Sequence, residues 1–122
     1  MKKIFKYLSI LYLIFLSIIF LMPLDFYLIT ESLTTEQHPS NSTSFLIHFI
    51  LFFILYSFMY FSFINKLNIF IFCLIYSFLI EFLQQFSSRG FQISDIIFNL
   101  LGFLTAFLLI LFFMQSLKTK KM

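Results

Sequence analysis

Six polar side chains stand out in an otherwise apolar chain, and their types and spacing could support chemistry. They are His48, Glu81, Gln84, Arg89, Asp95 and Asn99. Glu81 and Gln84 are spaced i, i+3, and Asp95 and Asn99 are spaced i, i+4, so each pair shares one face of a helix. Imidazole and carboxylate groups transfer protons, whereas amides and a guanidinium bind polar groups. We take all six as candidate ligand-binding residues, with His48, Glu81 and Asp95 also as candidates for acid–base catalysis.

The composition indicates what kind of element must position these residues. The chain has 122 residues, of which 61% are hydrophobic and only 11% are charged. A soluble domain carries charge on about a quarter of its positions, so the composition excludes a soluble globular protein. A membrane-spanning helix needs about 20 apolar residues, and the whole chain, residues 1–122, is therefore predicted to be one transmembrane domain.

Four apolar segments are long enough to span a membrane. They cover residues 4–24, 45–64, 67–86 and 94–114. Unbroken apolar runs exclude barrel strands, in which apolar and polar residues alternate. Pro23 is expected to end the first span, and residues 25–44 are expected to form a solvated loop. The connection at Asn65–Lys66 is short and predicts a tight hairpin, so we expect an all-α fold with four transmembrane helices in an antiparallel bundle.

The basic residues predict the orientation of this bundle. Seven of the eight are lysines near span ends or chain ends: Lys2, Lys3, Lys6, Lys66, Lys118, Lys120 and Lys121. Basic residues favour the cytoplasmic side, so both termini are predicted to be cytoplasmic, with Arg89 outside. The lysines form no continuous basic face, and we expect no nucleic-acid partner.

The predicted topology brings the six polar residues toward the outer boundary of the membrane. One interpretation is structural: Glu81, Arg89 and Asp95 form ion pairs that join the ends of the last two spans. The other is functional, because ionisable residues inside a membrane frequently mark binding or transport sites. For His48 alone, a hydrogen bond to Glu81 or Asn99 is the simplest role.

Two further features of the sequence bear on metal binding and on the packing of helices. A single cysteine, Cys73, and one histidine with carboxylates distant in the sequence make a poor metal motif, so we expect no metal and no cofactor. Gly102 and Ala106 form a small-xxx-small pair that lets a neighbouring helix approach closely. We expect this pair to pack within the bundle, with a homo-oligomer as the alternative.

The last two predicted spans also carry a family resemblance. The run from Glu81 to Gly102, with Gln84, Arg89, Asp95 and Asn99 in that order, resembles the signature of the VanZ-like membrane protein family. His48 and Phe49 resemble the family's other marked position. The chain departs from the family at Ser44 and Phe45, where an Asp–Lys pair is frequent, at Ala106, where a second glycine is common, and in a shorter segment before Arg89.

This resemblance implies a role in the bacterial cell envelope, since the family is named for an accessory protein of glycopeptide (teicoplanin) resistance. Our preferred hypothesis is a non-enzymatic protein of the bacterial cytoplasmic membrane. Its outer polar pocket would bind an envelope component, such as a lipid headgroup or a peptidoglycan intermediate. The alternatives are a small membrane enzyme acting on a lipid-linked substrate and a purely structural membrane scaffold.

Overall fold

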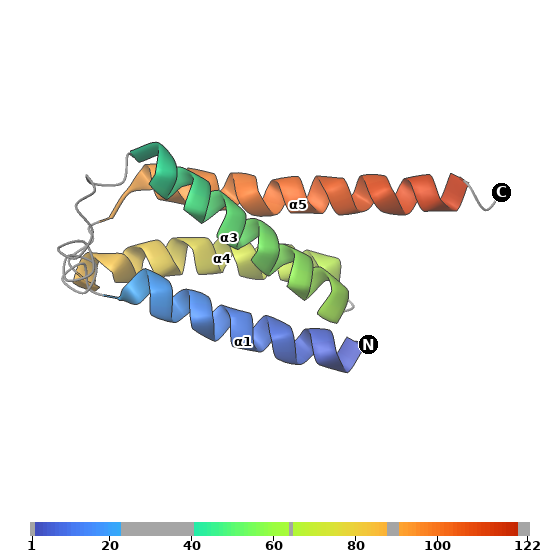
Figure 1. The fold of residues 1–122 in the computed structure, drawn as a ribbon, viewed down its shortest axis with the longest axis horizontal. Helices are drawn as coiled ribbons and strands as arrows, with labels where there is room; N and C mark the ends of the chain where they lie inside the picture. The colour runs from blue at the N-terminus through green and yellow to red at the C-terminus, as the bar shows by residue number, and fades with distance from the viewer. Residues whose placement is uncertain (1, 23–40, 64, 88–90, 120–122) are drawn as a thin grey trace, which may run out of the picture.

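The computed structural model describes residues 2–22, 41–63, 65–87 and 91–119, and within these residues the fold is all-α. The elements are α1 (Lys2–Leu21), α3 (Asn41–Ser62), α4 (Lys66–Gln84), the 3-10 turn η1 (Gln85–Ser87) and α5 (Ile93–Thr119) (Figure 1). Helices α1, α3, α4 and α5 are each long and apolar enough to cross a membrane. The predicted all-α class is therefore confirmed for the described part of the chain, which contains four helices with the length and apolarity that a membrane span requires.

The helix bounds differ from the predicted spans for identifiable reasons. Helix α1 ends at Leu21, and Met22, the residue before Pro23, already lies outside it, because a following proline disfavours the helical conformation. Helix α5 continues past residue 114 to Thr119, since Met, Gln, Leu and Lys remain good helix formers where hydropathy falls. Pro23 itself lies outside the described residues.

The prediction of a loop over residues 25–44 is wrong for residues 41–44. Helix α3 begins at Asn41 and includes residues 41–44. Asn, Ser and Thr occur in loops and also at helix starts, so composition alone did not distinguish the two. Residues 25–40 lie outside the described part of the chain.

The connection between α3 and α4 is short, as its sequence predicts. The Asn65 side chain caps α4 by accepting a hydrogen bond from the Asn68 backbone N–H at 3.3 Å. Lys66 Nζ donates to the backbone carbonyls of Tyr60 and Phe63 near the end of α3. A cationic side chain at a helix C-terminus satisfies carbonyls that have no partner within the helix. Lys66 therefore stabilises the end of α3, and Asn65 caps the start of α4.

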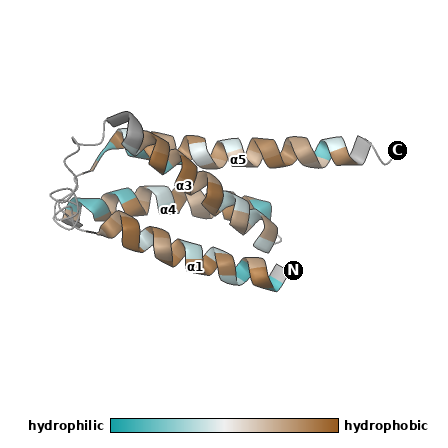
Figure 2. Cartoon of the chain, viewed as in Figure 1, coloured by the Kyte–Doolittle hydropathy of each residue, from teal (hydrophilic) through white to brown (hydrophobic). Residues whose placement is uncertain are grey.

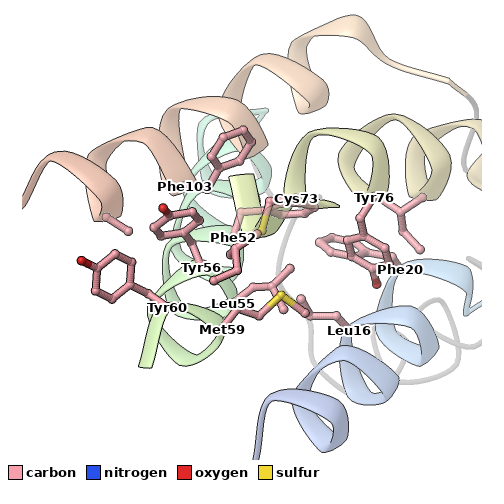
Figure 3. Close-up of a cluster of buried hydrophobic side chains, with 13 residues drawn as sticks. Leu16, Phe20, Phe52, Leu55, Tyr56, Met59, Tyr60, Cys73, Tyr76 and Phe103 are labelled. Atoms are coloured by element: carbon pink, nitrogen blue, oxygen red, sulfur yellow. The ribbon is translucent and has the colours of Figure 1, made fainter. Parts of the chain in front are cut away.

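Helix α3 lies at the centre of the packing and contacts α1, α4 and α5. Its buried Phe52, Leu55 and Tyr56 meet Leu16 of α1 and Phe103 of α5 in one core cluster (Figure 3). The outward faces are apolar as well. Among the exposed side chains are Leu11, Leu46, Ile75 and Phe112, one on each long helix. Figure 2 shows hydrophobic residues along the lengths of the helices and hydrophilic residues mainly toward their ends.

Gly102 lets α3 and α5 approach each other closely. It is buried, and a Cβ atom built on it would overlap the backbone carbonyl of Phe49 on α3. Ala106, one turn further along α5, is fully buried in the core cluster. The small-residue pair therefore faces a helix of the same chain.

Replacing Gly102 with Ala should destabilise the bundle, because the added methyl group must push α5 away from the Phe49 backbone. Overpacking of this kind costs about 1–3 kcal/mol. Unfolding of the purified protein in mixed micelles by titration with SDS measures the loss. Leu101→Ala, at an exposed neighbouring position, is the matched control and should change stability less. Equal stability of Gly102→Ala and the unmodified chain would contradict the close contact.

Candidate functional site

The predicted polar residues of three helices meet in one buried cluster. His48 comes from α3, Glu81 from α4, and Asp95 and Asn99 from the first turns of α5. Their exposed fractions are 5% for His48, 6% for Asp95 and 0% for Glu81 and Asn99. We call these four residues the polar centre. Burial of this much polarity is costly unless the groups interact with one another or with a ligand.

Two side chains on one face of α5 hold the imidazole of His48. Nδ1 of His48 lies 3.0 Å from Oδ1 of Asn99, within hydrogen-bond distance. On the opposite side of the ring, Nε2 lies 3.4 Å from Oδ2 of Asp95. Because Asp95 and Asn99 are one helical turn apart, they reach both ring nitrogens from a single helix face. The predicted hydrogen bond between His48 and Asn99 is present.

The face of the imidazole is covered from α1. The ring of Phe20 stacks on His48 with a centroid separation of 4.8 Å and an interplanar angle of 28°. Phe20 is itself almost completely buried. This contact shields one face of the imidazole, and with it all four long helices contribute to the surroundings of His48.

Glu81 ties α4 to the start of α5. Its Oε1 accepts a hydrogen bond of 2.8 Å from the backbone N–H of Gln92, the residue immediately before α5. The carbonyl of Gln92 in turn accepts from the backbone N–H of Asp95. The negative charge of Asp95 in the first turn of α5 is also favoured by the helix dipole. The two carboxylates thus stabilise the beginning of the helix that carries half of the polar centre.

The polar centre brings three chemically versatile groups together. One ligand-type atom from each of His48, Glu81 and Asp95 lies within 4.8 Å of the others. An imidazole beside a carboxylate can pass a proton, and three such groups can share a cation. The arrangement is therefore competent for proton transfer, for cation binding or for holding a polar group.

Two atoms of the polar centre have spare hydrogen-bonding capacity within the described part of the chain. Oδ1 of Asp95 and Nδ2 of Asn99 are buried and have no hydrogen-bond partner among those residues. A buried acceptor or donor without a hydrogen-bond partner lowers the stability of the fold by about 1–3 kcal/mol. A ligand that offers both a donor and an acceptor would satisfy them.

The structure places the six predicted ligand-binding residues as follows. His48, Asp95 and Asn99 are in direct contact, and Glu81 lies beside them. Gln84 is 2% exposed, one turn beyond Glu81 on α4. Arg89 lies outside the described residues, as do its predicted ion pairs.

Two contacts of the site could not be found in the sequence. Phe20 is one of 22 phenylalanines, and nothing in its neighbourhood distinguishes it as a partner of His48. Gln92 acts through its backbone N–H, which every residue except proline possesses. Neither contact leaves a signal in residue type or spacing.

The tyrosines and serines of the spans form hydrogen bonds that their sequence positions do not indicate. The hydroxyl of Tyr12 donates to the Leu51 carbonyl at 3.0 Å, linking α1 to α3. The hydroxyls of Ser17 and Tyr76 lie 2.9 Å apart and link α1 to α4. Each of these tyrosines therefore joins α1 to another helix.

Comparisons of the chain with models of protein families, with curated proteins and with solved structures find no match.

Replacing Glu81 with Leu should weaken the start of α5, because the Gln92 N–H loses its acceptor. Loss of a buried partner costs about 1–3 kcal/mol, and amide hydrogen exchange in the segment around Gln92 should accelerate. Glu81→Gln retains an oxygen that accepts the bond and should exchange more slowly than Glu81→Leu. Gln85→Leu, at an exposed position nearby, is the surface control. Unchanged protection in Glu81→Leu would show that the bond does not hold α5.

Proposed function

We propose that this chain is a multi-pass protein of the bacterial cytoplasmic membrane that binds the polar headgroup of an envelope component at its polar centre. In this proposal the four long helices form an antiparallel bundle with both termini in the cytoplasm, and the polar centre lies at the outer leaflet. The order of Glu81, Gln84, Arg89, Asp95 and Asn99 resembles that of the VanZ-like family. This resemblance connects the proposal with the cell envelope and with glycopeptide resistance.

The distribution of charge along the helices supports this orientation. Lysines occur at the start of α1, at the start of α4 and at the end of α5. Those helix ends lie toward one end of the view in Figure 1, whereas the end of α4 and the start of α5 lie toward the other. Basic residues favour the cytoplasmic side. The polar centre would then face the cell exterior, where envelope intermediates are used.

The observation that carries the proposed binding role is the convergence of His48, Glu81, Asp95 and Asn99 from three helices. An ionisable residue at the centre of a membrane helix costs about 2.5–3.5 kcal/mol on insertion scales, and the cost is smaller, though still unfavourable, toward the membrane boundary. Helix packing alone does not require ionisable residues, because apolar residues of similar size pack at least as well. The spare donor of Asn99 and the spare acceptor of Asp95 give a headgroup two specific contacts.

The placement of the polar centre suits an amphiphilic ligand. Its surroundings are apolar along the bundle, and Phe20 covers the imidazole from α1. A lipid-linked headgroup has its polar part at the membrane boundary and its tail among apolar helix faces. Because the polar centre is buried, entry of a headgroup requires side chains at this end of the bundle to open locally.

A second candidate function is acid–base catalysis on a lipid-linked substrate. The approach of His48 Nε2 to Asp95 Oδ2, at 3.4 Å, favours it. A carboxylate at Nε2 can orient an imidazole so that its other nitrogen takes up a proton from a substrate hydroxyl or water, and here the contact of Nδ1 with Asn99 must open first. A turnover product from the bound ligand would support this function, and binding without turnover would favour the non-enzymatic role.

Binding should discriminate a polyprenyl phosphate from the matching polyprenol, because a singly protonated phosphate has oxygens that accept from Nδ2 of Asn99 and a separate hydroxyl that donates to Oδ1 of Asp95, whereas the polyprenol has one hydroxyl for both contacts. The purified chain in lipid nanodiscs should retain the phosphate at least about tenfold more tightly, a difference of about 1.4 kcal/mol. Asn99→Leu should remove most of this preference. Native mass spectrometry of the complexes measures the fractions bound.

Thr105→Val is the matched control for this experiment. Thr105 lies on the same helix, and its hydroxyl bonds only within α5, to the Leu101 carbonyl. This variant should keep the preference for the phosphate, while circular dichroism confirms that both variants are helical. Equal binding of phosphate and alcohol by the unmodified chain, or an unchanged preference in folded Asn99→Leu, would identify the polar centre as a purely structural element.

A further inference from the structure

The ligand-type atoms of His48, Glu81 and Asp95 are close enough to share one metal ion. All three lie within 4.8 Å of one another. Zn²⁺ binds nitrogen and carboxylate oxygen at about 2.0–2.2 Å, so two ligands of one ion are at most about 4.4 Å apart. Small side-chain rotations therefore bring the three atoms to coordination distance. We propose that these residues bind a divalent transition-metal ion, Zn²⁺ being the best fit.

Asn99 prepares His48 for this role. Its Oδ1 lies 3.0 Å from Nδ1 of the imidazole, and an amide oxygen can only accept a hydrogen bond. Nδ1 therefore carries the hydrogen, and in the neutral ring Nε2 is the nitrogen that donates an electron pair. Histidine ligands of metals commonly donate their other N–H to a carbonyl or carboxylate in this way, which fixes the tautomer and the ring orientation.

In the neutral ring, the electron pair of Nε2 faces a carboxylate. Nε2 lies 3.4 Å from Asp95 Oδ2, and two electron-pair donors at this distance are stabilised by a cation between them. Oδ1 of Asp95 is also buried, without a hydrogen-bond partner among the described residues. The Asp95 side chain is more than nine-tenths buried, so water replaces neither interaction readily.

The charges of the three ligands match a divalent cation. A neutral imidazole with two ionised carboxylates carries two negative charges. One M²⁺ ion neutralises both. Two other positive charges could compete with the metal ion: His48 itself, with both ring nitrogens protonated, and Arg89, which lies outside the described residues.

The ligand types select among metal ions. Ca²⁺ takes six to eight oxygen ligands, and Mg²⁺ prefers oxygen and retains water, so an imidazole fits neither well. Soft ions prefer thiolates, and the single cysteine, Cys73, lies in the apolar core cluster. Imidazole with carboxylates suits Zn²⁺. The proposal differs from the expectation that the chain binds no metal, which the single cysteine and the distance in sequence between His48 and the carboxylates suggested.

Three protein ligands leave a coordination position open. Zinc sites that bind or hydrolyse substrates have this arrangement, whereas purely structural sites have four protein ligands. A water molecule or a ligand oxygen would occupy the remaining position. The metal site rests on the geometry of His48, Glu81 and Asp95 alone and does not require the proposed headgroup ligand.

The test uses the tag-free, full-length chain in detergent micelles without added envelope lipid. Co²⁺ serves as a spectroscopic probe of the site, and Zn²⁺ is then titrated against it. The unmodified chain should bind one Co²⁺ per molecule, with visible absorption bands that disappear when Zn²⁺ displaces it. His48→Ala should abolish these bands, and Asp95→Asn and Glu81→Gln should each weaken binding at least tenfold.

Two control variants should retain the bands: His38→Ala, which removes the other histidine, and Thr105→Val. Circular dichroism and elution volume establish that every variant is folded. Absence of Co²⁺ binding by the folded chain, or equal binding by His48→Ala, would overturn the proposal. Metal binding that occurs only in Arg89→Gln would also overturn it, because the arginine would then supply the positive charge in the native chain.

Discussion

The packing of the helices depends on the partners of one buried polar group, the imidazole of His48. The imidazole of His48 has Asn99 at one nitrogen, Asp95 at the other and the ring of Phe20 on its face. These contacts hold α3 against α5 and α1 in one register, because displacement of either helix by a turn would separate the polar atoms. After such a displacement the separated polar atoms would find no replacement partner, because the interior of a membrane contains no water.

One face of α5 serves both the site and the packing. Asp95, Asn99, Gly102 and Ala106 follow helical spacing, with the polar pair nearest the start of the helix. The polar pair holds His48, and Gly102 then permits close contact with the Phe49 backbone. Apolar contacts alone give helices little reason to associate in lipid. Polar contacts and close small-residue packing therefore carry much of the specificity of helix association, and both support the polar centre from the same face of α5.

The sequence was sufficient for the larger features and for part of the site. Long apolar runs predict four spans because a membrane helix needs about 20 such residues, and helical spacing correctly paired Asp95 with Asn99. The helix start at Asn41 was missed because Asn, Ser and Thr occur in both loops and helix starts. The stacking of Phe20 and the bond from the Gln92 backbone were missed because they depend on tertiary packing and on a group common to nearly all residues.

A double-mutant cycle between His48 and Asn99 tests most directly whether their contact organises the bundle. Unfolding of the unmodified chain, His48→Ala, Asn99→Leu and the double variant is measured in the same mixed micelles. We predict a coupling energy of at least about 1 kcal/mol, because each single substitution leaves a buried partner unsatisfied and the double substitution removes both. Additive effects, with a coupling energy below about 0.5 kcal/mol, would contradict it.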